Sequence, residues 1–106
     1  MSVGVTFARG FVAAGLAAGF KPSGRPDLAM LVGAPGTTAA GVFTTNRAEA
    51  APVTVARRRL ATTGGRARVV LVNSGQANGA TGGRGLADAE STTASAAELL
   101  DVEPDA

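Results

Sequence analysis

Residues 68–73, Arg-Val-Val-Leu-Val-Asn, decide the fold, and the rest of the chain is best understood outward from them. Four consecutive β-favouring apolar residues predict a strand that is buried on both faces. A loop rich in Gly, Asn, Gln and Thr follows at residues 74–85, and residues 86–100 then predict a helix. One side of that helix is formed by Leu86, Ala89, Thr93, Ala96, Ala97 and Leu100. Ligand sites often form in a loop at the C-terminal end of a strand in α/β folds.

Two further strands are predicted before this one. Residues 27–32 and residues 39–44 are short apolar runs, separated by the chain breaker Gly-Ala-Pro-Gly at 33–36, so a hairpin is expected to join them. Part of residues 1–24 is a candidate edge strand, although its many glycines weaken both strand and helix.

Residues 52–60 predict a short helix that Pro52 begins and that the glycines at 64–65 follow. Its predicted apolar face carries Val53, Ala56 and Leu60. The acidic residues Asp88 and Glu90 are expected in the first turn of the later helix, where the helix dipole favours negative charge. Together the elements predict an α/β fold, a layered sandwich with helices packed on a sheet, in one incomplete domain over residues 1–106.

Composition restricts the chemistry that this chain can perform alone. Hydrophobic residues make up 45% of the chain, but most are Ala and Val, which bury little area, so we expect the fold to depend on a partner or on further sequence. The chain has no Cys and no His, which excludes disulfides, thiolate metal sites and any Ser-His-Asp or Cys-His site built from these residues. We predict no metal, no cofactor and no membrane span, because the apolar run at 11–20 is too short.

Charge is unevenly distributed along the chain. Residues 1–85 hold ten basic and two acidic residues, whereas residues 86–106 hold six acidic and no basic ones. This pattern fits an acidic helix and tail beside a basic body, or a surface that attracts a carboxylate or a polyanion. Arg57, Arg58 and Arg59 are adjacent on a helix and point in different directions, so a solvated helix face is favoured over a nucleic-acid patch.

Two polar segments supply the candidate substrate-binding residues. In the loop 74–85, glycines allow close backbone approach to a ligand, Asn78 could orient one, and Arg84 near a helix start could hold an anion. The alternative is a tight connection in which Asn and Thr bond their own backbone. The loop is not a phosphate P-loop, because Gly-Lys-Ser/Thr is missing. Asn46 follows the strand 39–44, either in a polar pocket rim or in an ordinary turn.

Three blocks of sequence, in the right order and spacing, resemble the ornithine acetyltransferase (glutamate N-acetyltransferase) family. The first spans residues 10–21 with Asp-Leu-Ala at 27–29. The second is Ala-Ala-Gly-Val-Phe-Thr-Thr-Asn at 39–46 with Ala-Ala-Pro-Val at 50–53. The third is Val-Val-Leu-Val-Asn-Ser-Gly-Gln-Ala-Asn at 69–78 with Thr-Gly at 81–82.

This resemblance implies a cytoplasmic enzyme of arginine biosynthesis whose precursor cleaves itself and assembles with two copies of each resulting chain. Acetyl passes from N-acetylornithine, or from acetyl-CoA in some members, to the N-terminal Thr of the second chain and then to glutamate. The oxyanion motif Ser-Thr-Gly and the nucleophile are expected beyond residue 106, so no catalytic residue is assigned here. The implied partner is the missing C-terminal sequence or a complementary β chain, and the implied substrates are N-acetylornithine and glutamate.

The main hypothesis is therefore an N-terminal segment of such an acetyltransferase, a scaffold that is inactive alone and contributes Asn46, Asn78 or Arg84 to the pocket rim. The alternatives are a truncated, non-catalytic binding or interaction module of the same fold, and a small basic nucleic-acid binder. The distribution of charge and the absence of aromatic stacking partners make the last the weakest, so no nucleic-acid partner is predicted.

Overall fold

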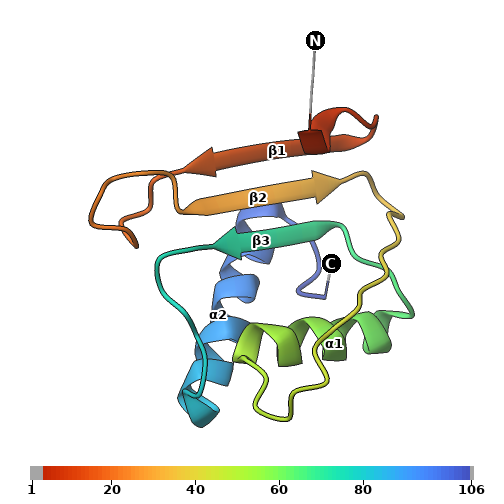
Figure 1. The fold of residues 1–106 in the computed structure, drawn as a ribbon. Helices are drawn as coiled ribbons and strands as arrows, with labels where there is room; N and C mark the ends of the chain where they lie inside the picture. The colour runs from red at the N-terminus through yellow and green to blue at the C-terminus, as the bar shows by residue number, and fades with distance from the viewer. Residues whose placement is uncertain (1–3, 106) are drawn as a thin grey trace. The chain divides into compact units, whose positions relative to one another are not determined.

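The computed structural model describes residues 4–105 of the chain (Figure 1). The chain divides into two compact units. The sheet unit comprises Met1–Thr37 and Ala67–Ala77, and the helical unit comprises Thr38–Arg66 and Asn78–Ala106. Each unit is built from two separate stretches of the chain. The expectation of one incomplete domain over residues 1–106 stays a prediction.

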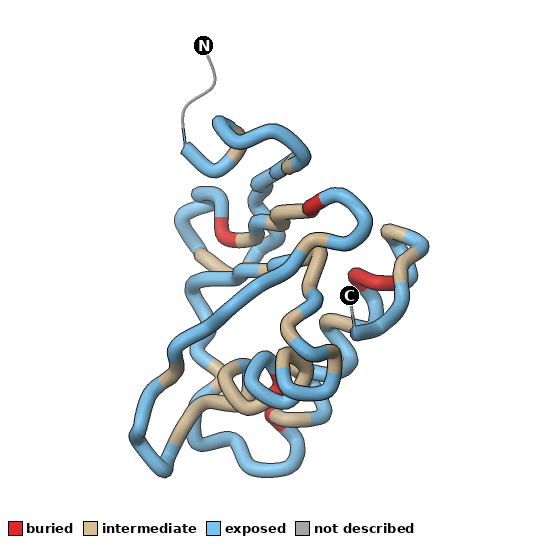
Figure 2. Tube along the Cα trace, turned by 90° about the vertical axis from the view of Figure 1, so that its right-hand side faces the viewer, coloured by how far each residue is buried: buried red, intermediate tan, exposed pale blue. Residues whose placement is uncertain are grey.

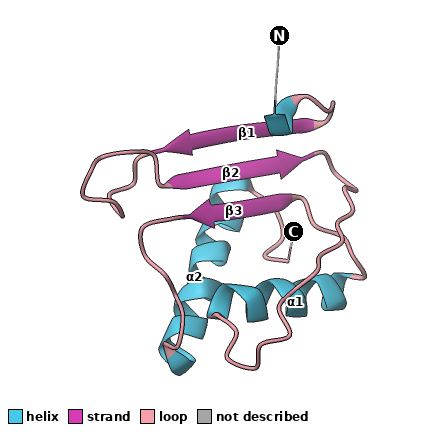
Figure 3. Ribbon diagram, in the orientation of Figure 1, coloured by secondary structure: helices cyan, strands magenta, loops and turns pink. Residues whose placement is uncertain are grey.

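The sheet unit contains a short 3-10 helix, η1 (Gly4–Thr6), and three antiparallel strands in the order β1-β2-β3 (Figure 3). The strands are β1 (Phe11–Leu16), β2 (Leu28–Gly33) and β3 (Val69–Asn73). Strands at 27–32 and 68–73 are thus confirmed within a residue, and so is the candidate edge strand within residues 1–24. The predicted hairpin partner of β2 was wrong, because β1 forms that hairpin from the N-terminal side.

Residues 39–44 do not form the predicted strand. Thr38 makes an isolated bridge with Arg66, and the Ala39 N–H donates to the Gly65 carbonyl, but pairing stops there. Ala and Gly dominate this segment, so it offers few side chains for cross-strand packing, and the Phe43 ring instead lies under the Arg57 guanidinium. The segment is therefore irregular chain beyond the bridge at Thr38.

The prediction that β3 is buried on both faces was also wrong for this chain. Val70 and Val72 remain 51% and 54% exposed, whereas Val69 and Leu71 on the other face are half-buried. Figure 2 shows how few positions of the chain are fully buried. On that other face, Val12 and Leu16 of β1 are 67% and 53% exposed, so neither face of the sheet is buried throughout.

In the helical unit, α1 (Ala51–Thr63) confirms the helix predicted at 52–60 and extends it by one turn. Pro52 lies in the first turn, and Gly64 ends the helix in the left-handed conformation at φ 65°, as glycine at this position allows. The buried residue of α1 is Val55, while the predicted Ala56 is exposed. The buried face of α1 is therefore turned slightly around the helix axis from the face that residue spacing predicted.

The second helix, α2 (Gly82–Leu100), begins four residues earlier than predicted and packs against α1. Its predicted apolar side is confirmed, since Ala96 and Ala97 are buried and the other four members are half-buried. Asp88 and Glu90 lie beyond the first turn because of the earlier start, so that prediction was wrong. Across residues 4–105, neither helix is long and apolar enough to cross a lipid bilayer. The α/β class is confirmed.

Candidate functional site

Asn78 joins the beginnings of both helices in the helical unit. Its carbonyl accepts a hydrogen bond from the Ala51 N–H at 3.2 Å, at the start of α1. Its side-chain amide donates to the Gly85 carbonyl at 2.7 Å, and its amide oxygen accepts from the Thr81 hydroxyl, both at the start of α2. Asn78 therefore fixes local backbone, as expected of the tight connection considered from the sequence.

Gly85 makes this network possible. A Cβ at position 85 would collide with the side chains of Thr81 and Asn78. Thr81 occupies the N-cap position of α2 without a capping side-chain bond, and its hydroxyl donates to the Asn78 amide oxygen instead. The start of α2 is thus held by three residues that the sequence places within eight positions.

The other two candidate residues are more accessible. Arg84 lies in the first turn of α2 and is exposed, and within residues 4–105 it has no hydrogen bond or ion pair. Asn46 forms a local turn, since its side-chain oxygen accepts from the Ala48 N–H at 2.9 Å and its own N–H donates to the Thr44 hydroxyl at 3.1 Å. The structure thus brings Asn78 and Arg84 to the same helix start, while Asn46 lies in the turn before α1.

The three adjacent arginines of α1 are each paired with an acid. Arg57 binds Glu49 at 2.7 Å and also donates to the Thr44 carbonyl at 3.0 Å. Arg58 binds Glu90 at 2.9 Å, and Arg59 lies 3.9 Å from Asp105. This pairing neutralises the run locally and disfavours a nucleic-acid patch.

The sheet unit contains one buried ionisable residue, Asp27, which sequence reasoning did not single out as a site. Its carboxylate accepts from the Ala18 N–H at 2.6 Å and the Lys21 N–H at 2.8 Å. Its own backbone bonds to Leu16 and to Ser74. Asp27 therefore anchors the loop between β1 and β2; its place directly after Arg-Pro and before an apolar strand was the available signal.

These contacts hold the pKa of Asp27 below its ordinary value of 3.8. The backbone N–H of Ala18 contributes most, then that of Lys21, because both stabilise the ionised form. Burial acts in the opposite direction and is outweighed. A carboxylate so satisfied is a structural anchor rather than a proton donor or acceptor.

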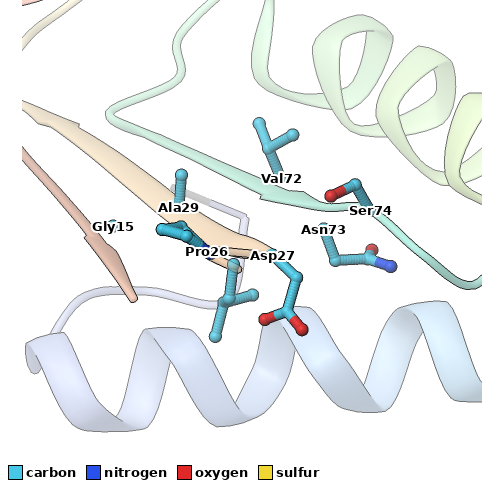
Figure 4. Close-up of a pocket in the computed structure, with 8 residues that line it drawn as sticks. Gly15, Pro26, Asp27, Ala29, Val72, Asn73 and Ser74 are labelled. Atoms are coloured by element: carbon cyan, nitrogen blue, oxygen red, sulfur yellow. The ribbon is translucent and has the colours of Figure 1, made fainter. Parts of the chain in front are cut away.

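An open hollow of about 140 Å³ lies at this end of the sheet (Figure 4). It is lined by Gly15, Pro26, Asp27, Leu28, Ala29, Val72, Asn73 and Ser74. None of the three predicted site residues lines it. The hollow is mostly apolar, and its polar lining residues are Asp27, Asn73 and Ser74.

Comparison with known proteins identifies the family. A sequence model of the ArgJ family matches residues 12–106, which is nearly the whole chain. The chain belongs to the ArgJ family. This confirms the resemblance to ornithine acetyltransferases that the three sequence blocks carry.

Individual ArgJ proteins agree with this assignment. The arginine biosynthesis bifunctional protein ArgJ of Parasynechococcus marenigrum is 48% identical over 106 residues, all of this chain and 26% of that protein. The crystal structure of a Mycobacterium tuberculosis ornithine acetyltransferase in complex with ornithine matches with a TM-score of 0.84 and 51% identity, over 92% of this chain and 51% of that one. The Bacillus halodurans ArgJ structure matches with a TM-score of 0.86 and 38% identity, over 92% and 50%.

The chain spans about a quarter of the length of the ArgJ relatives that it matches. The solved ArgJ structures match a three-stranded sheet with two helices, so this part of the family fold is present here. The matched region holds Asn78, Arg84 and Asn46, and their part in substrate binding stays a prediction.

Proposed function

We propose that this chain is the N-terminal part of an enzyme that transfers an acetyl group from N-acetylornithine, or from acetyl-CoA, to glutamate in arginine biosynthesis. The observation that carries the proposal is the match to the ornithine-bound acetyltransferase, at 51% identity and a TM-score of 0.84 over 92% of this chain. The role assigned to the chain is that of a scaffold with a pocket rim. The protein acts in the cytoplasm.

Residue chemistry supports a scaffold role. The chain has no His and no Cys, and its best satisfied carboxylate, Asp27, is bound by backbone N–H groups. The Thr81 hydroxyl donates to an amide oxygen, which is not a base that could activate it. We therefore assign the nucleophile and the oxyanion donors to polypeptide beyond residue 106, within the same precursor or a complementary β chain.

The rim role is assigned to the start of α2. Arg84 is exposed in the first helical turn, where backbone N–H groups and the helix dipole favour an anion. Asn78 holds that turn in place through Gly85. A substrate carboxylate of N-acetylornithine or glutamate has the charge and the two acceptor oxygens that a guanidinium binds best. Asn46 is the more distant member of the proposed rim.

A chimera tests the proposed function directly. Residues 1–106 replace the corresponding quarter of the Parasynechococcus marenigrum ArgJ protein, and ornithine release from N-acetylornithine is measured with glutamate as acceptor. We expect a rate within about an order of magnitude of the parent, because the exchanged region positions substrate without supplying the nucleophile. The 106-residue chain alone should show no transfer. A folded chimera without activity contradicts the proposal, as does activity of the chain alone.

The rim is tested in the same chimera with Arg84→Ala. Loss of the guanidinium should raise the KM for an amino-acid substrate about tenfold or more and change kcat less, since binding in ground and transition states is weakened together. Arg58→Ala is the matched control, because that arginine is engaged by Glu90. Equal KM values for both variants argue against Arg84 as a rim residue.

A further inference from the structure

Asn78 is followed directly by Gly79, whereas Asn46 is followed by Arg47 and Asn73 by Ser74. The backbone nitrogen of the residue after an asparagine can attack the carbonyl carbon of the asparagine side chain. Glycine favours this attack, because it has no Cβ to obstruct the approach and its backbone adopts many conformations. Of the three asparagines in the chain, Asn78 therefore has the neighbour that best permits spontaneous deamidation.

Deamidation proceeds through a cyclic imide. The Gly79 nitrogen forms a bond to Cγ of Asn78 and gives up its proton, and the amide nitrogen Nδ2 leaves as ammonia. A water molecule then opens the imide at either carbonyl. The product is aspartate, or isoaspartate, in which the main chain runs through the former side chain. Water enters and ammonia leaves, so no oxidant, cofactor or further reactant is required.

In the structure the attacking nitrogen is free and the attacked amide is held. Within residues 4–105, the Gly79 N–H donates no hydrogen bond. By contrast, the Asn78 amide is bound at both ends, by the Gly85 carbonyl at 2.7 Å and by the Thr81 hydroxyl. These two bonds and the bond from Ala51 to the Asn78 carbonyl are here called the Asn78 network. Ring closure expels Nδ2 and displaces the side-chain oxygen, so it requires the network to open.

The backbone after Gly79 shows that the network constrains this turn. Ala80 has φ 53°, in the left-handed region that residues with a Cβ rarely adopt, and Gly82 has φ 63°. Such a conformation persists only where surrounding contacts fix it. The contacts of Asn78 with Thr81 and Gly85 close the turn over these residues. Opening the network therefore releases both the side chain of Asn78 and the backbone that the reaction must rearrange.

We propose that Asn78 is a deamidation site that the Asn78 network keeps closed, and that its modification releases the starts of α1 and α2. An aspartate at position 78 cannot donate to the Gly85 carbonyl, because an ionised carboxylate only accepts hydrogen bonds. Isoaspartate also turns the main-chain carbonyl that binds the Ala51 N–H into part of a free carboxylate. The inference rests on contacts within this chain and not on the proposed function.

Peptide mapping of the full-length chimera by mass spectrometry tests the closed site. The chimera is kept at neutral pH, either folded or unfolded in urea, and aspartate and isoaspartate at position 78 are quantified over time. We expect deamidation in the folded chimera to be slower by about tenfold or more, because ring closure occurs only on local opening. Equal rates in the folded and unfolded chimera overturn the proposal.

Thr81→Val tests the network itself, since it removes the hydroxyl and keeps the shape of the side chain. Deamidation of Asn78 in the folded chimera should become about threefold to tenfold faster, as expected for loss of a hydrogen bond. The matched control is Thr92→Val on the same helix, because the Thr92 hydroxyl donates to the Asp88 carbonyl at 2.7 Å and does not contact Asn78. Equal rates in the two variants, or a slower rate in Thr81→Val, overturn the role of the network.

Asn78→Asp reproduces one product and tests the consequence of the modification. Hydrogen exchange of the folded chimera should become about tenfold faster over residues 51–55 and 82–86, while β2 keeps its protection. Unchanged exchange at both helix starts overturns the proposed release. Acetyl transfer by the same chimera is measured separately, so an inactive chimera with slow deamidation refutes the acetyltransferase role alone. An active chimera that deamidates as fast as in urea refutes the closed site alone.

Discussion

The sheet unit and the helical unit treat their apolar residues in opposite ways. Among residues 4–105, most large exposed hydrophobic side chains belong to the sheet unit, namely Val5, Phe7, Val12, Leu16, Val70 and Val72. The buried apolar residues Val55, Ala96 and Ala97 all lie on the packed helices of the helical unit. The helices thus bury apolar side chains against each other, whereas the sheet unit leaves large apolar side chains exposed.

Polar groups follow the same division. In the sheet unit one buried carboxylate, Asp27, holds a loop through backbone N–H groups. In the helical unit, exposed arginines and acids pair across the surface. We therefore expect stability to depend most on buried positions of the helices, next on Asp27, and least on the surface ion pairs.

The largest effect is expected from Ala97→Asp. This change places an unpaired charge at a buried position of α2 and should reduce the free energy of unfolding by about 3 kcal/mol or more. The matched control is Leu99→Asp on the same helix, where the side chain is 84% exposed and the cost should stay below about 1 kcal/mol. Urea unfolding followed by circular dichroism measures both. Equal losses would show that the helical unit is not packed as described.

The next effect is expected from Asp27→Ala in the sheet unit. The substitution leaves the N–H groups of Ala18 and Lys21 without their acceptor, so the urea midpoint should fall by less than for Ala97→Asp. Because the pKa of Asp27 is lowered in the folded state, its contribution is full above 3.8 and is lost as pH falls through the lower folded value. The wild-type chain should therefore lose more stability on acidification below pH 3.8 than the variant does. Parallel acid curves for the two proteins would contradict this role.

Local signals explain which parts of this fold could be predicted. The run Val-Val-Leu-Val predicted β3, and Gly64 predicted the end of α1. The apolar spacing of residues 86–100 predicted the buried side of α2. The strand predicted at residues 39–44 did not form, because Ala and Gly offer few side chains for cross-strand packing and β2 pairs with β1 and β3 instead. Pairing across the chain is not encoded in any short window.

The candidate site shows the same limit. Asn78 and Arg84 share the start of α2, and their nearness along the sequence made that predictable. The bonds of Asn78 to both helix starts were not predictable, because one partner, Ala51, is distant in sequence. Apart from its position after Arg-Pro, nothing in the sequence marked Asp27, because the groups that bind its carboxylate are the backbone N–H groups of Ala18 and Lys21 and not side chains.

Smaller changes in stability, opposite in sign, are expected when two glycines of α2 are replaced by alanine. Gly85→Ala forces a Cβ against Thr81 and Asn78 and should cost about 1–3 kcal/mol. Gly83→Ala has open space around its Cβ, and should stabilise by about 0.4–1 kcal/mol because alanine restricts the unfolded chain. Thermal unfolding of the two variants provides the measurement. A stabilising Gly85→Ala would mean that the Asn78 network is absent in solution.

The smallest effect is expected from the surface pair Arg58–Glu90, whose side chains are 54% and 47% exposed. Arg58→Ala should cost less than about 1 kcal/mol, and added salt should reduce that cost further, since exposed ion pairs are screened.

Arg57→Ala is the comparison, because Arg57 also bonds the Thr44 carbonyl and lies 5.2 Å from the Phe43 ring centroid. Its loss should cost more and depend less on salt, since the contact with Phe43 includes packing of the side chain. A double-mutant cycle with Glu90→Ala isolates the pair energy. A coupling energy between Arg58 and Glu90 well above 1 kcal/mol would show that surface charges, and not only the buried alanines, stabilise the helical unit.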